Sequence, residues 1–506
     1  MGQPMESALG TCLVATRFAE KLGLGRDERR RVYYLSLLQH VGCTAMNHEM
    51  AGAIGDEIAL RAGSTTLDLF DGRTGGRYVA AFVGQRFPGE RAGKMASRVR
   101  EAEALFKEGH AAACEVAQML GGRFGLEADL RRDLGSVYER WDGLGHPGRI
   151  GGEGLSLTLR IVHVVDGARM LFDAGGVESV RQSLPQRAGG WYDPRIVEAF
   201  LAQVDELLRP LAARSRWDEV VATEPGGPTD LANERLDEVL LAMAEVQNLK
   251  SPYLVNHSTG VAKLAERAAR RAGLSNADVT TVRRAAWLHD LGRVGISAAI
   301  WGKPESLSSP EWEQVRLHAY HTDRVLARIP RARDAGTTDA FEIASLHHER
   351  NDGSGYFRGA PVSILPLTAR ILAAADAYHA MTEIRPHRDP LSRQEAAAQL
   401  ALEVRAGRID SEAARAVLEA AGEPPARRET HVAGLTAREV EVLGLLARGL
   451  TTREIANAMT ISPKTADKHV EHIYSKAGVS TRAAATLFAI QHDLLADPRP
   501  IPSKIR

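Results

Sequence analysis

A group of histidine and aspartate side chains between residues 251 and 420 could hold metal ions. His289-Asp290 and His347-His348 are adjacent pairs, and the carboxylate of a His-Asp pair can bridge two cations while the imidazole binds one. Imidazoles and carboxylates suit divalent iron, manganese, zinc or nickel, and this set has no thiolate that would favour a structural zinc. Two such cations about 3.5–4 Å apart can activate a shared water and clamp a phosphodiester. The candidate ligands are His257, His289, Asp290, His318, His347, His348 and Asp376, with His379 as a further candidate.

Helices are expected to position these side chains, because apolar residues recur every three to four positions along much of the chain. The pattern is clear in residues 261–272, 280–288 and 395–404, and the sequence has no long alternating strand pattern. An all-α fold is therefore predicted. Segments 223–229 and 421–428 have the Pro- and Gly-rich composition of linkers. They divide the chain into predicted domains at 1–222, 230–420 and 433–506.

Composition limits what the whole chain can be. Its 506 residues contain 64 Lys and Arg and 64 Asp and Glu, so the formal net charge is zero. This excludes a uniformly basic nucleic-acid coat, although one small domain could still bind DNA. Three cysteines are too few for a disulfide framework, and the apolar runs are too short to span a membrane. We therefore expect a cytoplasmic protein without a membrane partner.

Several motifs of the middle domain occur together in one known enzyme family. Residues 347–356 read His-His-Glu-Arg-Asn-Asp-Gly-Ser-Gly-Tyr, and residues 288–292 read Leu-His-Asp-Leu-Gly. Arg370-Ile371-Leu372 precedes Asp376, and residues 385–388 read Arg-Pro-His-Arg. Over residues 251–420 the chain resembles the HD-GYP family of metal-dependent phosphodiesterases. The resemblance implies a helical domain with a dinuclear centre in which Asp290 is the bridge. The implied ligands are His257, His289, Asp290, His318, His347, His348 and Asp376.

The resemblance also implies roles for residues around the ligands. Asp290 and Arg293 are the implied catalytic residues. Substrate contacts are implied for Arg385 and Arg388, whose planar guanidinium groups suit phosphates, and for the loop residues Arg350 and Asp352.

The chain departs from the family pattern at four positions. Arg293 replaces a lysine and keeps the charge, although arginine does not readily donate a proton. Phe357 replaces the proline of the family motif. Tyr253 offers no carboxylate, and His379 replaces an aspartate, so a third metal is disfavoured. We therefore expect two divalent ions, with Fe or Mn favoured over Zn or Ni.

Residues 1–222 look like another copy of this domain that has lost its ligands. We call residues 1–222 the first copy and residues 230–420 the second copy. The offset between matching positions is 250 residues near His40 and 210 near Asp166, so the first copy has 40 additional residues between 44 and 109. Where the second copy has metal ligands, the first has Ser7, Gln39-His40 and Val137-Tyr138, and it retains Asp166 and His110. Two interpretations remain: a packing partner for the second copy, or a ligand pocket in which His40, His110 and Cys43 bind a cofactor.

The C-terminal segment carries helix-capping and DNA-binding patterns. Thr436 with Glu439 and Thr451 with Glu454 have capping-box spacing, and Ser462-Pro463 predicts the start of a helix over 463–476. Residues 435–443, 453–456 and 462–470 resemble LuxR-type DNA-binding domains. The resemblance implies a four-helix helix-turn-helix domain whose helix 463–476 enters the major groove of double-stranded DNA. The residues expected nearest the DNA are Lys464, Thr465, Lys468 and His469. A helical dimerisation cap is the alternative.

Together these features predict a transcriptional regulator that hydrolyses or senses a cyclic dinucleotide, with cyclic di-GMP favoured. A homodimer is expected because helix-turn-helix proteins usually read paired half-sites. Two alternatives remain open: a non-enzymatic regulator that senses a metal or ligand, and a diiron oxygenase. Arg293 and Phe357 favour the first alternative, and the phosphate-type arginines argue against the second.

Overall fold

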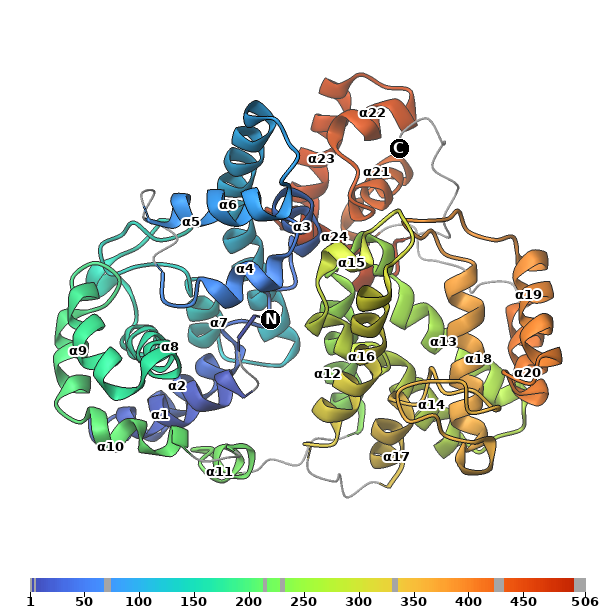
Figure 1. Cartoon of the computed structure of the whole chain (residues 1–506), viewed down its shortest axis with the longest axis horizontal. Helices are drawn as coiled ribbons and strands as arrows, with labels where there is room; N and C mark the ends of the chain where they lie inside the picture. Colours follow the sequence, from blue (N-terminus) through green and yellow to red (C-terminus); the bar gives the residue numbers. More distant parts are fainter. Residues whose placement is uncertain are drawn as a thin grey trace. The chain divides into compact units, whose positions relative to one another are not determined.

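The computed structural model of this chain is built from α-helices (Figure 1). It describes residues 2–3, 6–67, 74–212, 216–227, 233–329, 335–422 and 432–495, and within these ranges it contains isolated β-bridges but no strand. The all-α prediction is confirmed. Contacts divide the chain into two compact units, Met1–Asn233 and Glu234–Arg506. None of the described helices is both long enough and apolar enough to cross a membrane.

The first unit packs its helices around one main apolar core. Phe18 and Phe200 meet edge to face in this core, with ring centroids 5.2 Å apart, and both are fully buried. The helices that supply the core are α1 (Ser7–Lys21), α2 (Arg26–Leu38), α6 (Ala92–Arg123), α7 (Ala128–Leu134), α8 (Leu157–Ser183), α9 (Pro194–Leu201) and α10 (Val204–Leu208).

The additional residues of the first unit form a helical subdomain. It consists of α3 (Asn47–Ile54), α4 (Glu57–Gly63), α5 (Thr74–Arg86) and the N-terminal part of α6. Met50, Ile54, Leu60 and Val83 are buried together in a separate apolar cluster. The insertion therefore folds on an apolar core of its own. Helix α11 (Trp217–Ala222) follows later, near the end of the unit.

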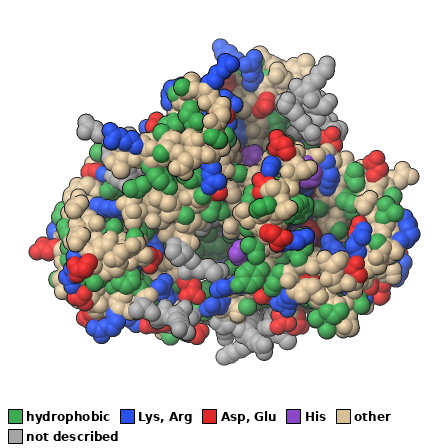
Figure 2. Space-filling view, in the orientation of Figure 1, with side chains coloured by type: hydrophobic (Ala, Val, Ile, Leu, Met, Phe, Trp, Pro, Cys, Tyr) green, Lys and Arg blue, Asp and Glu red, His purple; other side chains and the backbone are tan. Residues whose placement is uncertain are grey.

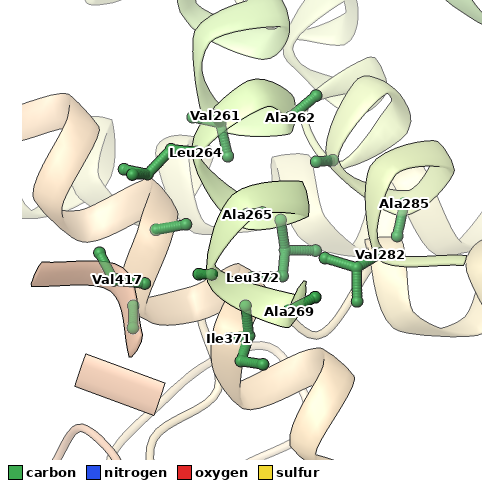
Figure 3. Packing of buried hydrophobic residues seen from close by; sticks show 14 of the residues in the cluster. Val261, Ala262, Leu264, Ala265, Ala269, Val282, Ala285, Ile371, Leu372 and Val417 are labelled. Carbon is green, nitrogen blue, oxygen red and sulfur yellow. The ribbon is translucent and has the colours of Figure 1, made fainter. Parts of the chain in front are cut away.

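The second unit begins with α12 (Asn233–Asn248) and builds its core mainly from α13, α14, α18 and α20 (Figure 3). Val261 and Leu264 of α13 lie in a cluster with Val282 of α14, Ile371 of α18 and Val417 of α20, all 4% exposed or less. This packing fixes the helix ends that carry the candidate ligands. The elements are α13 (His257–Arg271), α14 (Asn276–Leu288), α15 (Ala298–Trp301), α16 (Ser309–Leu326), α17 (Ala335–Ala344), α18 (Leu367–Met381), α19 (Arg393–Arg405) and α20 (Ser411–Ala421).

Matching helices and glycines in the two units support a duplication. Helices α1 and α13 both have 15 residues, α2 and α14 both have 13, and each pair is offset by 250 positions. A Cβ atom at Gly42 would lie 2.0 Å from the carbonyl oxygen of Ala113, and one at Gly292 would lie 2.0 Å from that of His318. Only glycine permits this close approach of backbone to backbone. Both units thus place one segment against another in the same way.

The C-terminal helices are α21 (Ala437–Ala447), α22 (Thr452–Met459), α23 (Pro463–Ala477) and α24 (Arg482–Gln491). The two predicted capping boxes are confirmed, because Thr436 and Thr451 each cap a helix reciprocally with the glutamate three residues later. Gly478 ends α23 with a φ of 67°, a left-handed conformation that glycine adopts without strain. Acidic and basic side chains are mixed over the visible face of the molecule, in keeping with the zero net charge (Figure 2).

Candidate metal centre

Five segments of the second unit bring the candidate ligands together. His257 is the first residue of α13, His289-Asp290 follows the end of α14, and Asp376 lies in α18. His318 lies in α16, and His347-His348 follows α17. Except for the half-buried His348, each of these side chains belongs to a residue no more than 3% exposed. The segments span some 120 positions of sequence, so only the folded core can assemble them.

Asp290 lies at the centre of the group, and its two carboxylate oxygens face different partners. Oδ2 lies 3.3 Å from His257 Nε2 and 3.1 Å from His289 Nε2. Oδ1 lies 3.5 Å from both His318 Nε2 and His347 Nε2. Asp376 Oδ1 joins the first set at 3.1 Å from His257 Nε2. One carboxylate therefore stands between two groups of donors, which is the arrangement a bridging ligand needs.

Hydrogen bonds on the opposite side of the rings fix which nitrogen faces the centre. The Nδ1 atoms of His289, His318 and His347 lie 2.8, 2.5 and 2.9 Å from the carbonyl oxygens of Ala286, Val315 and Ala344, three residues earlier in each case. Since a carbonyl only accepts, each Nδ1 carries the proton and each Nε2 presents a lone pair inward. Such bonds orient the histidines of metal sites.

The second unit leaves buried polar atoms at this centre without hydrogen bonds. Five of them are His257 Nε2, His289 Nε2, both oxygens of Asp290 and Asp376 Oδ1. Buried polar atoms normally have partners, and leaving one unmade costs about 1–3 kcal/mol. Cations would satisfy these lone pairs, so the donor set fits divalent metal. Three ligand groupings overlap here: His257 with His289 and Asp376, His289 with Asp290 and His347, and His318 with His347 and His348.

Electrostatics keep Asp290, His318 and His347 in the forms that bind cations, whereas the neighbouring carboxylates, Glu383 first, outweigh burial and raise the pKa of His257 to about 10. Burial would raise the pKa of the Asp290 carboxyl, but the Arg293 guanidinium and the neighbouring imidazoles outweigh it and hold that pKa well below its usual range. Burial lowers the pKa of His318 to about 3 and also lowers that of His347. The carboxylate is therefore charged and these imidazoles neutral near pH 7, as metal ligation requires.

Two residues that the sequence did not single out support the ligands. Glu383 Oε2 lies 2.8 Å from His257 Nδ1, so a carboxylate orients this imidazole where carbonyl oxygens orient the others. Thr322 Oγ1 donates to the carbonyl oxygen of His289 at 3.0 Å and accepts from the Gly292 amide at 2.9 Å, which fixes the turn that holds Asp290. The only sequence signal for Glu383 is its position four residues after His379.

His379 lies beside the group and not at its centre. Its Nδ1 is 3.3 Å from Glu383 Oε1, and together with His257 the two residues form a fourth grouping of possible metal ligands. This grouping shares His257 with the set that contains His289 and Asp376.

The residues for which catalytic or substrate roles are implied make different contacts. Arg293 Nε forms an ion pair with Asp290 Oδ1 at 2.8 Å. Arg385 pairs with Glu383 at 2.8 Å, and Arg388 donates to the carbonyl oxygens of Met381 and Ala380. Two loop residues make local bonds: Arg350 donates to the carbonyl oxygen of Glu349 at 2.8 Å, and Asp352 is exposed and accepts from Ser354.

The residues expected at DNA lie on the first half of α23. Lys464, Thr465 and Lys468 are exposed and His469 is half-buried, while Ala466 is fully buried beneath them. The Ser462 hydroxyl caps the helix by accepting from the Thr465 amide at 3.1 Å. One face of the helix thus packs inward and the other is free to contact a ligand.

Comparison with known proteins accounts for both regions. Residues 242–413 match the HD domain family model, and residues 433–489 match the model for bacterial regulatory proteins of the luxR family. The chain carries an HD domain and a LuxR-type domain. The HD domain resembles those of cyclic-nucleotide phosphodiesterases, and the LuxR-type domain is helical, as expected.

Curated relatives and a solved structure extend this result. The chain is 28% identical over 401 residues to 3'3'-cGAMP-specific phosphodiesterase 3 of Vibrio cholerae, covering 76% of this chain and 84% of the relative. It is 35% identical over 164 residues to a cyclic di-GMP phosphodiesterase of Thermotoga maritima, covering 32% of this chain and 44% of that protein. A crystal structure of a V. cholerae cyclic GMP-AMP-specific phosphodiesterase matches with a TM-score of 0.57 at 24% identity, covering 84% of this chain and 94% of that one, which shows a shared fold.

Proposed function

We propose that the HD domain hydrolyses a cyclic dinucleotide with two divalent metal ions, and that the LuxR-type domain binds double-stranded DNA. The observation that carries this proposal is the position of Asp290, whose two oxygens face separate sets of histidines. Relatives named for cyclic di-GMP and for 3'3'-cGAMP support the substrate class. Iron and manganese are the metals proposed, and the imidazole and carboxylate donors also suit zinc or nickel.

Each side chain contributes a defined part to the chemistry. His257, His289 and Asp376 would hold one ion, His318, His347 and His348 the other, with Asp290 between them. When bound, such ions activate a water and neutralise phosphate charge. Arg293 holds the Asp290 carboxylate in place and keeps it charged. Arg385 and Arg388 present positive charge beside the centre, which suits the phosphates of a dinucleotide.

The DNA-binding domain lies in the same unit as the metal centre. It contacts α13, the helix that begins at the candidate ligand His257. The side-chain amide of Asn256, the residue before His257, lies 3.5 Å from the carbonyl oxygen of Leu495, and Lys263 pairs with Asp493 at 2.9 Å. These contacts support control of DNA binding by the state of the centre. The proposed regulator acts in the cytoplasm as a homodimer on paired half-sites.

Turnover by the purified full-length protein tests the enzyme. The protein is prepared without oxygen, loaded with Fe²⁺ or Mn²⁺ and incubated with cyclic di-GMP or 3'3'-cGAMP, and the products are separated. We expect linear or mononucleotide product from the wild type and none above background from Asp290→Ala, because that change removes the bridge. Glu313→Gln, an exposed change on α16, is the matched control and should retain full activity.

Metal content, DNA affinity and oxygen consumption, measured on the same protein, separate the alternatives. Full activity of Asp290→Ala would contradict the mechanism. A protein that binds about two metals, forms no product and changes its DNA affinity with ligand would be a non-enzymatic sensor. Oxygen consumption with an organic co-substrate would identify an oxygenase.

Lysine substitution tests the DNA interface. We expect Lys468→Ala to weaken binding about equally across sequences and to lower the salt slope of the affinity by about 1, because a lysine here contacts phosphate. Binding is measured on promoter fragments at several salt concentrations. Lys476→Ala is unsuitable as a control because Lys476 pairs with Glu439 at 2.7 Å inside the domain; the exposed Arg415→Ala on α20 serves instead.

A further inference from the structure

The first unit assembles a different set of reactive side chains where the second has its metal centre. Cys43 and His40 lie in the turn between α2 and α3, and Tyr138 lies in the turn after α7. Cys43 Sγ is 3.0 Å from the Tyr138 hydroxyl and 3.9 Å from His40 Nδ1. The other ring nitrogen of His40 is 3.8 Å from Asp166 Oδ2, in α8. The imidazole of His40 therefore lies between the thiol of Cys43 and the carboxylate of Asp166.

Asp166 is held in place by two further residues. Its Oδ1 accepts from the Thr11 hydroxyl at 2.8 Å and lies 3.5 Å from the guanidinium of Arg169, which is 1% exposed. Arg169 also donates to Thr11 at 3.0 Å. A carboxylate fixed in this way can orient His40 and stabilise its charged form. This is the arrangement that nucleophilic cysteines use, with a base beside the thiol and a third group behind the base.

The charges around Cys43 favour a thiolate. Burial would raise the pKa of its thiol, but His40 together with Arg61 and Tyr138 outweighs burial and lowers that pKa to about 6. Burial would likewise lower the pKa of His40, but Asp166 and Cys43 raise it to about 9. Both shifts favour the form of the pair with a Cys43 thiolate and a His40 imidazolium.

The remaining cysteines provide an internal contrast. Cys12 is fully buried and Cys114 is 4% exposed. Burial raises the pKa of Cys114 to about 12 and that of Cys12 further. Cys43, by contrast, is half-buried, and the side chain of His40 beside it is 42% exposed. Only Cys43 therefore combines access with an activating neighbour among the three cysteines of this chain.

We propose that Cys43 is a reactive thiolate that hydroperoxides oxidise to a sulfenic acid. The sulfur attacks one peroxide oxygen, so an S–O bond forms and the O–O bond breaks. Sulfur loses two electrons and the peroxide gains them. The leaving oxygen takes the proton of the His40 imidazolium and departs as water or an alcohol. His40 is suited to this step because its Nδ1 faces the Cys43 sulfur and its Nε2 faces the Asp166 carboxylate.

Alkylation of the full-length protein tests the thiolate. Iodoacetamide is applied to the native protein from pH 5 to 9.5, and each cysteine is followed by peptide mass spectrometry. We expect Cys43 alone to react quickly, with a midpoint near pH 6. In His40→Gln the midpoint should rise by at least about one pH unit, towards the value of a free thiol near 8.5. A wild-type midpoint near 8.5, or the same midpoint in His40→Gln, would overturn the thiolate pair.

Oxidation then tests the assigned reactant. Wild type is treated with hydrogen peroxide at pH 7 and trapped with a sulfenic-acid reagent. We expect trapping at Cys43, none at Cys12 or Cys114, and at least about tenfold slower trapping in His40→Gln. Cys43→Ser should abolish the signal. Rapid alkylation without sulfenic acid would overturn the assignment of hydroperoxide as the reactant. Circular dichroism of each variant establishes that its helices are intact.

Discussion

The two units share a helical framework but place different chemistry inside it. In the second unit, the positions after α14 and α17 carry His289-Asp290 and His347-His348. In the first, the matching positions carry Gln39-His40 and Val137-Tyr138. Among the residues that the structure describes, all groupings of possible metal ligands lie in the second unit. A few substitutions at helix ends therefore separate a candidate metal centre from a cluster of thiol, imidazole and carboxylate.

The framework survives because other residues maintain it. Gly42 and Gly292 permit the same close approach to a carbonyl oxygen. Gly145 and Gly355 are equally confined. A Cβ atom at either would lie 2.5 Å from the backbone nitrogen of the arginine five residues earlier, which is Arg140 or Arg350. Packing and backbone approach thus define the fold, whereas the side chains at the centre are free to change.

Transplanting first-unit residues into the second unit should have the largest effect. We expect His347→Val with His348→Tyr to reduce bound metal from about two ions to about one, because His318 and one oxygen of Asp290 cannot hold an ion alone. Hydrolysis should fall by about 10³-fold or more, which is about 4 kcal/mol of transition-state stabilisation. Metal analysis and turnover measure both. Undiminished metal content would show that these histidines are not ligands.

Removing the carboxylate behind His257 should have a smaller effect. In Glu383→Gln the imidazole loses its charged partner at 2.8 Å. Loss of such a supporting group typically costs 10- to 100-fold in metal affinity. Titration of the metal-free protein with Mn²⁺ measures this, and excess metal should restore most of the activity. An unchanged affinity would mean that Glu383 does not support a ligand.

Matched glycine substitutions should have equal effects on the two units. Gly42→Ala and Gly292→Ala each place a methyl group 2.0 Å from a carbonyl oxygen. We expect each to destabilise its own unit by about 1–3 kcal/mol, as overpacking does. Chemical denaturation followed by unit-specific proteolysis reports which unit unfolds first. Hydrolysis should fall in Gly292→Ala and persist in Gly42→Ala; a tolerated Gly42→Ala would show that the first unit has relaxed this constraint.

Much of this architecture could be predicted from the sequence. Periodic apolar residues located the helices, and cap residues such as Thr436 and Ser462 located several of their ends. The adjacent pairs His289-Asp290 and His347-His348, together with the resemblance to the HD-GYP family, predicted the ligand positions. Glu383 could not be found in this way, because its role depends on how the segment after α18 folds back against α13. The sequence grouped His40 with Cys43 and placed Asp166 at a former ligand position. It could not show that His40 lies between the other two, because that depends on the packing of α2 on α8 across more than 120 positions of sequence.

The buried donor atoms at the metal centre also bear on how the two copies diverged. Lone pairs buried at Asp290 and Asp376 cost stability unless cations satisfy them, so a copy that keeps these side chains depends on metal for part of its stability. A copy released from catalysis gains by losing them. Ser7 and Val137 stand where His257 and His347 do, at the first residue of α1 and in the turn after α7, and neither side chain carries an imidazole nitrogen that needs a partner. Loss of the ligands from the first unit is therefore expected to make its stability independent of metal. Asp166 remains, and its Oδ2 lies 3.8 Å from His40 Nε2.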